Sequence, residues 1–176
     1  MEEQFENEQV GIEALPRVQN IQFIQLEPTY LKVRMWTVMI IFTILLIPLG
    51  IFIYHQFDEL PTFVLAIIGG LWFLLMSWSF AVTYFGFSKK GYALRSKDVL
   101  YRSGLIWRSQ TVIPFNRVQH CEVSQGPIAR WMKVASLEVF TAGGTNSDMT
   151  IPGLQPNVAY RMKDFIIQQT GFDEEE

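Results

Sequence analysis

The sequence has little cysteine, little histidine and little charge. Cys121 is the single cysteine among 176 residues, and the two histidines are His55 and His120. One cysteine excludes an internal disulfide framework and a metal site built from several cysteines. The two histidines lie too far apart in the chain to form a local metal motif, so we predict neither a metal nor a cofactor.

Charged residues make up 18% of the chain, against about 25% in an ordinary soluble domain. Two long runs, residues 36–54 and 60–87, carry no charge at all. A helix that spans a bilayer needs about 20 apolar residues. The runs therefore predict two transmembrane helices, over about 36–54 and 60–84. The alternative, a helical hairpin buried in a soluble core, is disfavoured by uncharged runs of this length.

Further absences restrict the function. Neither run contains an ionisable residue, and such residues are the usual mark of an ion or proton pathway in a membrane protein. The chain also lacks a phosphate-binding glycine-rich loop, a zinc-ligand spacing and a nucleophile-elbow motif. These absences argue against a transporter, and we predict that the protein is not an enzyme.

The flanking charges predict the orientation. Lys32 and Arg34 precede the first run, Lys89 and Lys90 follow the second, and residues 55–59 between the runs contain neither Lys nor Arg. Basic residues collect on the cytoplasmic side of membrane spans. We therefore expect a multi-pass protein with both termini in the cytoplasm.

Charge divides the chain into four parts. We expect an acidic cytoplasmic arm over 1–34, a transmembrane hairpin over 35–87, a cytoplasmic domain over 88–171 and an acidic tail over 172–176. Residues 88–170 hold eleven bases and five acids, a net charge of +6. Such a domain is attracted to anionic lipid, although its bases can also serve only to set topology. A moderate charge held at a membrane fits nucleic-acid binding poorly.

Residues 88–171 read as mostly β. Short strand-like runs cover 91–95, 99–107, 110–115, 118–124, 135–141 and 148–151, with turn residues between them. A helical turn fits 127–133, and apolar residues at helical spacing predict a C-terminal helix with Asn157 as its N-cap. Residues 17–25 alternate loosely, as a strand added to a sheet edge would, but we interpret their similarity to residues 117–125 as chance.

Several motifs together resemble a known family. The chain from 91 to 170 is similar to the bacterial pleckstrin-homology (PH) domains of the small YdbS-like, membrane-flanked proteins. The segments that carry the resemblance are 26–30 (LEPTY), 103–104 (SG), 113–119 (IPFNRVQ), 125–130 (QGPIAR), 137–143 (LEVFTAG) and 151–154 (IPGL). One departure is visible, because a glycine is usual in this family near Lys133.

The resemblance implies an α+β membrane protein: a two-helix transmembrane hairpin followed by a PH-like antiparallel β-barrel or sandwich, capped by a C-terminal helix. It implies a bacterial inner (plasma) membrane protein that acts as a binding or assembly module, with a role in envelope integrity or stress resistance. The implied partners are membrane lipids and another membrane protein with related PH-like domains, or a second copy of the chain.

Three polar residues are candidates for binding. Arg117, Gln119 and Arg130 could hold a lipid head group or an acidic segment of a partner, because arginine grips phosphate or carboxylate with two parallel hydrogen bonds. A structural role is the alternative: Arg117 can satisfy backbone carbonyls at the start of a strand.

Two turns supply the other candidates. Arg95 and Lys97 fall in the turn where, by the resemblance, lipid-binding relatives place a basic cluster. Trp107 and Arg108 fall in the next turn, where an exposed tryptophan beside an arginine suits a membrane interface or a partner's pocket, unless Trp107 belongs to the core. We expect Cys121 to be a small buried apolar residue.

Overall fold

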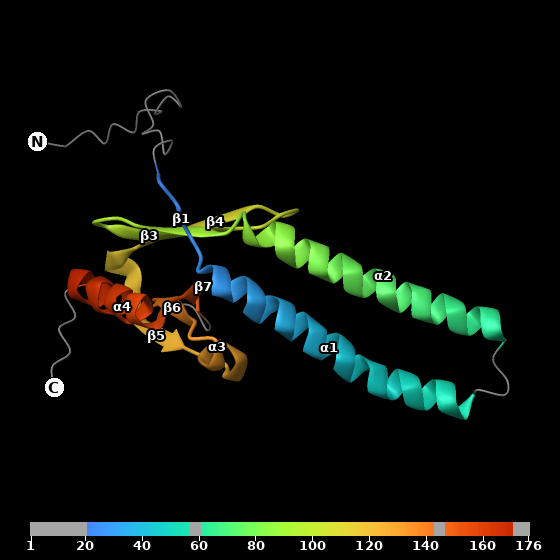
Figure 1. Cartoon of the computed structure of the whole chain (residues 1–176). Coiled ribbons are helices and arrows are strands. Elements are labelled where there is room, and N and C mark those ends of the chain that lie inside the picture. The colour runs from blue at the N-terminus through green and yellow to red at the C-terminus, as the bar shows by residue number, and fades with distance from the viewer. Residues whose placement is uncertain (1–20, 57–60, 143–146, 171–176) are drawn as a thin grey trace, which may run out of the picture.

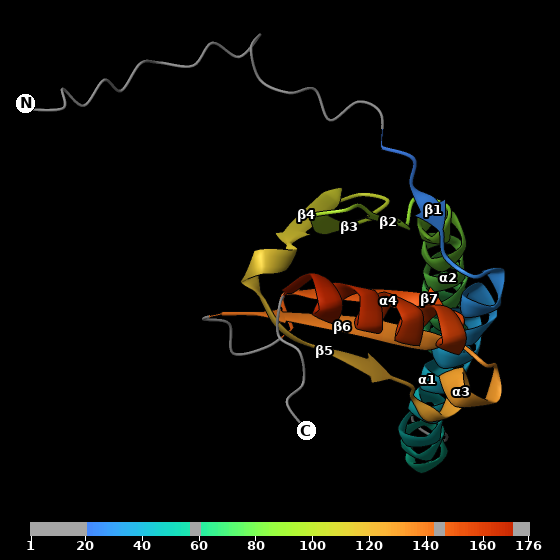
Figure 2. The ribbon, with the colours of Figure 1, turned by 90° about the vertical axis from the view of Figure 1, so that its left-hand side faces the viewer.

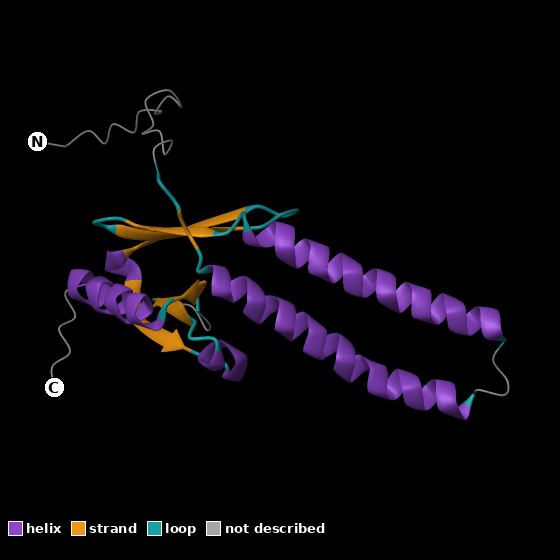
Figure 3. Ribbon diagram, in the orientation of Figure 1, coloured by secondary structure: helices purple, strands orange, loops and turns teal. Residues whose placement is uncertain are grey.

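Two long helices run side by side away from a β-rich domain (Figures 1 and 3). The structure is a computed structural model that describes residues 21–56, 61–142 and 147–170. The helices are α1 (Pro28–His55) and α2 (Thr62–Phe87). We call β1 together with residues 88–170 the β domain.

Both helices are long and apolar enough to cross a membrane, and the most apolar stretch of each is not buried in the protein. The span predicted over 36–54 lies within α1. The span predicted over 60–84 falls on α2, although residue 60 lies outside the described residues and the helix continues to Phe87. Phe42 and Trp72 join the helices, with ring centroids 5.7 Å apart in an edge-to-face arrangement. Apolar side chains left open to the surroundings are suited to lipid, not to water.

Two antiparallel sheets form the β domain (Figure 2). The first has the strand order β1-β2-β3-β4 and the second β5-β6-β7. The strands are β1 (Ile24–Gln25), β2 (Gly91–Leu94), β3 (Asp98–Ser103), β4 (Ser109–Pro114), β5 (Val118–Ser124), β6 (Ala135–Thr141) and β7 (Met149–Leu154). A 3-10 turn η2 (Phe115–Arg117) joins the sheets, a short helix α3 (Pro127–Trp131) follows β5, and α4 (Pro156–Thr170) covers one face.

The membrane hairpin is inserted between the first two strands of one sheet. Ile24 pairs with Tyr92 and Gln25 with Gly91, and Leu26 is buried in the domain core. The arm that we predicted over residues 1–34 therefore differs from the structure in its last part. Its end forms β1 and the first turns of α1, because Ile24 to Leu26 can complete a sheet edge that β2 would otherwise leave open.

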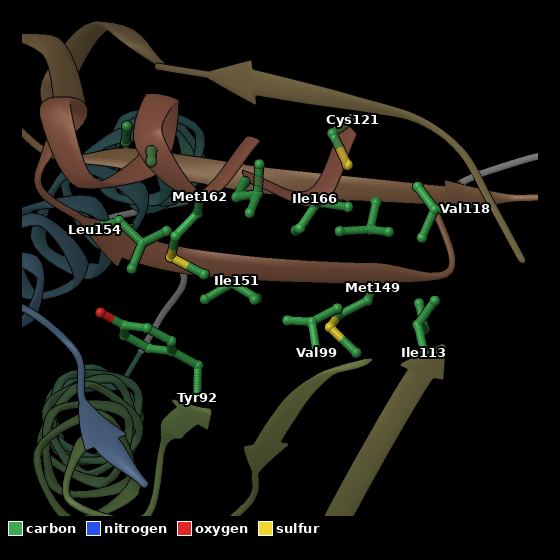
Figure 4. Packing of buried hydrophobic residues seen from close by; sticks show 14 of the residues in the cluster. Tyr92, Val99, Ile113, Val118, Cys121, Met149, Ile151, Leu154, Met162 and Ile166 are labelled. Carbon is green, nitrogen blue, oxygen red and sulfur yellow. The ribbon is translucent and has the colours of Figure 1, made fainter. Parts of the chain in front are cut away.

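Apolar side chains from both sheets and from α4 form one core (Figure 4). Val99 of the first sheet faces Ile151 of the second, and Ile113 faces Val118. Met162 and Ile166, one helical turn apart on α4, close the other side. These contacts confirm the expected fold of two packed sheets with a capping C-terminal helix.

Strand β3 ends four residues earlier than the predicted strand 99–107. Gly104 has φ +111°, and a Cβ atom added there would lie 1.6 Å from the carbonyl oxygen of Trp107. Only glycine takes this conformation without strain. The chain therefore turns at Gly104, and residues 104–108 form a turn between β3 and β4.

Two further boundaries differ at the C-terminal end. Strand β7 continues through Pro152 and Gly153 to Leu154, where we predicted an end at Ile151. Helix α4 begins at Pro156, and the Asn157 side chain accepts a hydrogen bond from the N–H of Val158 at 2.8 Å. Asn157 is thus inside the helix and is not its N-cap. Proline at the first helical position has its φ already set for a helix, which explains the earlier start.

The beginning of α1 is fastened to the end of β7. The N–H of Glu27 donates to the carbonyl oxygen of Gly153 at 2.8 Å. The Gln155 side chain donates to the Glu27 carboxylate at 3.0 Å, and Tyr30 lies directly against Gly153. These contacts tie the membrane hairpin to the β domain.

Candidate functional site

Strand register sorts the turns of the β domain into two ends. Gly91 pairs with Arg102, and Ser103 pairs with Ser109. The β3–β4 turn (residues 104–108) therefore lies where β2 leaves α2, and we call this the membrane end. The β2–β3 turn (residues 95–97) lies at the other end of β3, about 17 Å away at about 3.3 Å per residue. We call that the distal end.

Four of the predicted site residues lie at the distal end: Arg95, Lys97, Arg117 and Gln119. The Phe115 N–H donates to the carbonyl oxygen of Lys97 at 3.0 Å, which places η2 and its Arg117 beside the β2–β3 turn. Gln119 follows at the irregular start of β5, and all four side chains are exposed. Contact with the membrane that holds α1 and α2 does not fit this position.

The charge of Arg95 is already matched. Its guanidinium makes a two-pronged ion pair with the Asp98 carboxylate, including a hydrogen bond from Nε to Oδ1 of 2.6 Å. This hydrogen bonding to Asp98 raises the pKa of Arg95. An arginine that is already paired with a carboxylate attracts an anionic ligand less strongly. Lys97 is therefore the residue of this turn whose positive charge is not matched by an acid among the described residues.

Bases and hydroxyl groups gather instead at the membrane end. An open cavity of about 420 Å³ lies between the end of α2 and the β3–β4 turn, and we call it the junction cavity. Lys89, Arg102 and Arg108 supply its positive charge. Its other lining residues are Ser88, Ser103, Gly104, Ser109 and Gln110. The lining has no acid, and it combines several hydrogen-bond donors with three cations.

The cations of the junction cavity have no ion pair within the described residues, where Arg95 pairs with Asp98 and the His120 ring lies 3.5 Å from the Glu122 carboxylate. The Arg102 guanidinium lies 4.2 Å from the centre of the Phe23 ring. Stacking of this kind orients a guanidinium but leaves its charge in place. The cavity is therefore electrostatically suited to an anion.

A second, smaller cavity of about 180 Å³ adjoins the first at Gly104 and opens between α1 and α2. It contains Arg34 and Lys90. Partial burial of the ammonium lowers the pKa of Lys90, and the nearby charge of Arg34 lowers it further. Lys90 also lies 5.7 Å from the centre of the Tyr30 ring. Two cations close together without an acid increase the positive potential of the membrane end.

Arg130 lies apart from these residues, on α3 beside the start of α1. It lines an open groove with Glu27 and Lys133, so an acid is already present there. Lys133 has φ +54°, in the left-handed region that favours glycine. This is the place where the family resemblance leads one to expect glycine, and here a lysine adopts a backbone conformation that favours glycine.

Cys121 is buried in the core, only 4% exposed. Burial raises the pKa of its thiol to about 11. A thiol that stays protonated at neutral pH is a poor nucleophile. Its neighbour His120 points to the other face of β5 and stacks on Phe140 at 4.2 Å.

Trp107 and Arg108, predicted as candidates from their turn, lie at the membrane end. Lys89 and Arg102, which line the junction cavity, are not among the predicted site residues. The positive-inside bias by itself accounts for Lys89, and Arg102 lies inside a strand. The signal that could have joined them is the pairing of β2 with β3, because the register puts Arg102 beside Gly91. The exposed Trp107 is not part of the core.

The comparisons agree with this architecture. Residues 22–170 match the bacterial PH domain family, and the match begins before β1 and ends with α4. The chain is 28% identical over 148 residues to the UPF0699 transmembrane protein YdbS of Bacillus subtilis (strain 168), covering 81% of this chain and 89% of that protein. No solved structure matches the chain. A sheet completed across a membrane hairpin, a second sheet and a capping helix thus lie within one matched region, and the chain belongs to the bacterial PH domain family.

Proposed function

We propose that this chain is a non-enzymatic membrane protein whose PH domain binds the phosphate of anionic lipid head groups in the junction cavity. The observation that carries the proposal is the meeting of Lys89, Arg102 and Arg108, without an acid, directly where α2 leaves the membrane. Arginine and lysine beside hydroxyl groups are the side chains that recognise phosphate.

The proposal includes an orientation. Both helices cross a bacterial plasma membrane, and the β domain and both termini lie in the cytoplasm. Support comes from the bases Lys32 and Arg34 before the first apolar run and Lys89 and Lys90 after the second, as expected for cytoplasmic flanks. In this orientation the junction cavity faces the inner leaflet, whose anionic lipids attract basic residues by about 1 kcal/mol each.

A second candidate is assembly with another membrane protein or with a second copy. Strand β4 supports it, because β4 ends the first sheet and has no neighbour on its outer side among the described residues. Its Val112 is 44% exposed. An open strand edge is a template for pairing with another chain.

Lipid binding is tested with the full chain in mild detergent, by native mass spectrometry during titration with phosphatidylglycerol or phosphatidylcholine. The variant Lys89→Gln/Arg102→Gln/Arg108→Gln is compared with Arg95→Gln/Lys97→Gln/Arg117→Gln, which loses the same charge at the distal end. At about 1 kcal/mol for each base, the first variant should bind phosphatidylglycerol roughly a hundredfold more weakly, and the second should bind almost as the unchanged protein.

Equal losses in the two variants, or equal binding of the two lipids by the unchanged protein, would refute the proposed lipid site. Recovery of a stoichiometric protein partner together with either result would favour assembly. Added salt gives an independent check, because exposed charges are screened over about 8 Å at physiological ionic strength. Lipid binding should weaken with salt, whereas pairing through a strand edge should change little.

A further inference from the structure

The tip of the β3–β4 turn exposes two large apolar side chains. Ile106 is 69% exposed and Trp107 is 88% exposed, and the basic Arg108 follows them in the sequence. Exposing an isoleucine and a tryptophan side by side to water brings no stabilisation, whereas an apolar pair beside a base is typical of a surface that contacts a membrane.

The turn lies along α2, on its membrane side. A Cβ atom added at Gly86 would be 3.9 Å from Cβ of Leu105. Val82 and Thr83 line one cavity together with Leu105. Figure 1 shows the turn reaching beside the C-terminal end of α2, away from the rest of the first sheet.

The depth of this position follows from the length of α2. From Thr62 to Val82 the helix rises about 30 Å at about 1.5 Å per residue, which equals the thickness of a typical hydrocarbon core. Residues level with Val82 and Gly86 therefore lie at the boundary between hydrocarbon and head groups. Tryptophan is enriched at this boundary, since its ring is apolar and its N–H needs a polar partner.

The backbone holds the tip in place. Gly104, with φ +111°, turns the chain against the carbonyl of Trp107, and the last pair of the β3–β4 ladder, Ser103 with Ser109, closes the turn at its base. A short turn of fixed shape can present two side chains to a bilayer with little loss of conformational entropy.

We propose that Ile106 and Trp107 insert into the interfacial layer of the bilayer that holds α1 and α2, so that the β domain is fixed to the membrane surface at a third point. The partner is the lipid surface itself. The contact is continuous with the membrane hairpin, and it is independent of anionic lipid, because apolar insertion occurs in neutral bilayers as well. The insertion of the turn can therefore be tested independently of the proposed lipid binding in the junction cavity.

The test uses the full chain in nanodiscs of phosphatidylcholine, a lipid without net charge, so that attraction to an anionic surface does not contribute. Trp107→Cys and Ile106→Cys are each made in a Cys121→Ala background and labelled with a small environment-sensitive fluorophore. Lys97→Cys, at the distal end, is the matched control. Quenching by lipids that carry a nitroxide near the head group is compared with quenching by iodide in the water.

We expect the nitroxide lipids to quench the label at 106 and at 107 several-fold more than the label at 97, and iodide to show the reverse order. If labels at all three positions respond alike, the turn does not insert. Loss of iodide quenching at 107 without nitroxide quenching, together with a cross-linked pair of chains, would replace the bilayer by a second copy as the occupant. If the Trp107→Cys variant does not fold, the label at position 106 shows whether the turn inserts into the bilayer.

Discussion

Tyr30, in the first turn of α1, packs against Gly153, in the last part of β7. A Cβ atom at Gly153 would lie 2.5 Å from Cγ of Tyr30, and the residue has φ +67°. Together with the hydrogen bond from the Glu27 N–H to the Gly153 carbonyl, this contact joins a membrane helix to the core of the β domain. Its position decides how the hairpin leaves the domain.

Gly153→Ala should destabilise the full chain by about 2 kcal/mol or more, because a left-handed backbone costs a residue with a Cβ atom about 1–2 kcal/mol and an overfilled contact costs about 1–3 kcal/mol. The measurement is the free energy of unfolding in detergent. Gly126→Ala is the control, since nothing lies within 4 Å of a Cβ atom there. Similar losses at the two positions would show that the Tyr30 contact is not tight.

Lys133→Gly should stabilise the protein by about 0.5–1 kcal/mol. The left-handed φ of +54° costs a residue with a Cβ atom roughly 1–2 kcal/mol, and part of the gain is lost to the greater freedom of glycine in the unfolded chain. Lys133→Ala removes the same charge but keeps the Cβ atom. It should not raise the melting temperature, and a rise in both variants would point to charge as the cause.

The Cys121 thiol should resist modification at pH 8. With a pKa of about 11, about one thiol in a thousand is ionised at that pH, and the thiolate is the reactive form. An exposed Lys97→Cys in a Cys121→Ala background should react fast under the same conditions. Rapid reaction of Cys121 in the folded chain would mean that the core is open.

The raised pKa of Cys121 also predicts that the stability of the protein depends on pH. The folded pKa of Cys121 lies above its ordinary value of 9.0, so the folded state holds its proton more tightly than the unfolded state. The free energy of unfolding should therefore be undiminished below about pH 9 and should fall as the pH rises toward about 11. A Cys121→Ala variant should show less of this decrease.

The proposed orientation can be read in intact cells. In a Cys121→Ala background, Asp58→Cys, which lies between the two apolar runs in the sequence, should react with a membrane-impermeant maleimide, because residues 55–59 are expected outside. Lys97→Cys should react only after the cells are opened. Labelling of Lys97→Cys in intact cells would reverse the orientation and would remove the junction cavity from the inner leaflet.

Local sequence patterns were sufficient to predict much of the fold. The two uncharged runs predicted α1 and α2, because length and apolarity alone make a span. The alternation of residues 118–124 and 135–141 predicted β5 and β6 with the bounds that the structure shows, since successive side chains of a strand point to opposite faces. The predicted faces of β5 are wrong at its start, because the register shifts between Val118 and His120 and buries both Val118 and Cys121. The helical spacing of Met162 and Ile166 predicted a capping helix.

Local patterns could not reveal contacts between distant segments. Residues 17–25 alternate loosely, and their last part, Ile24–Gln25, does form an edge strand. The pattern does not indicate which strand is its partner, because β2 follows the whole membrane hairpin. The conformations of Gly153 and Lys133 depend on what packs around them, and no spacing shows this.

Two membrane-spanning segments, a β-rich basic domain and a buried Cys121 can all be predicted from the amino-acid sequence, since each depends on the composition or pattern of one continuous segment. Which basic residues lie close together depends instead on how the chain folds. The register of β2, β3 and β4 sends Arg95 and Lys97 to the distal end and brings Lys89, Arg102 and Arg108 together at the membrane end. Pairing between strands sets that register, and pairing is a property of the folded chain as a whole.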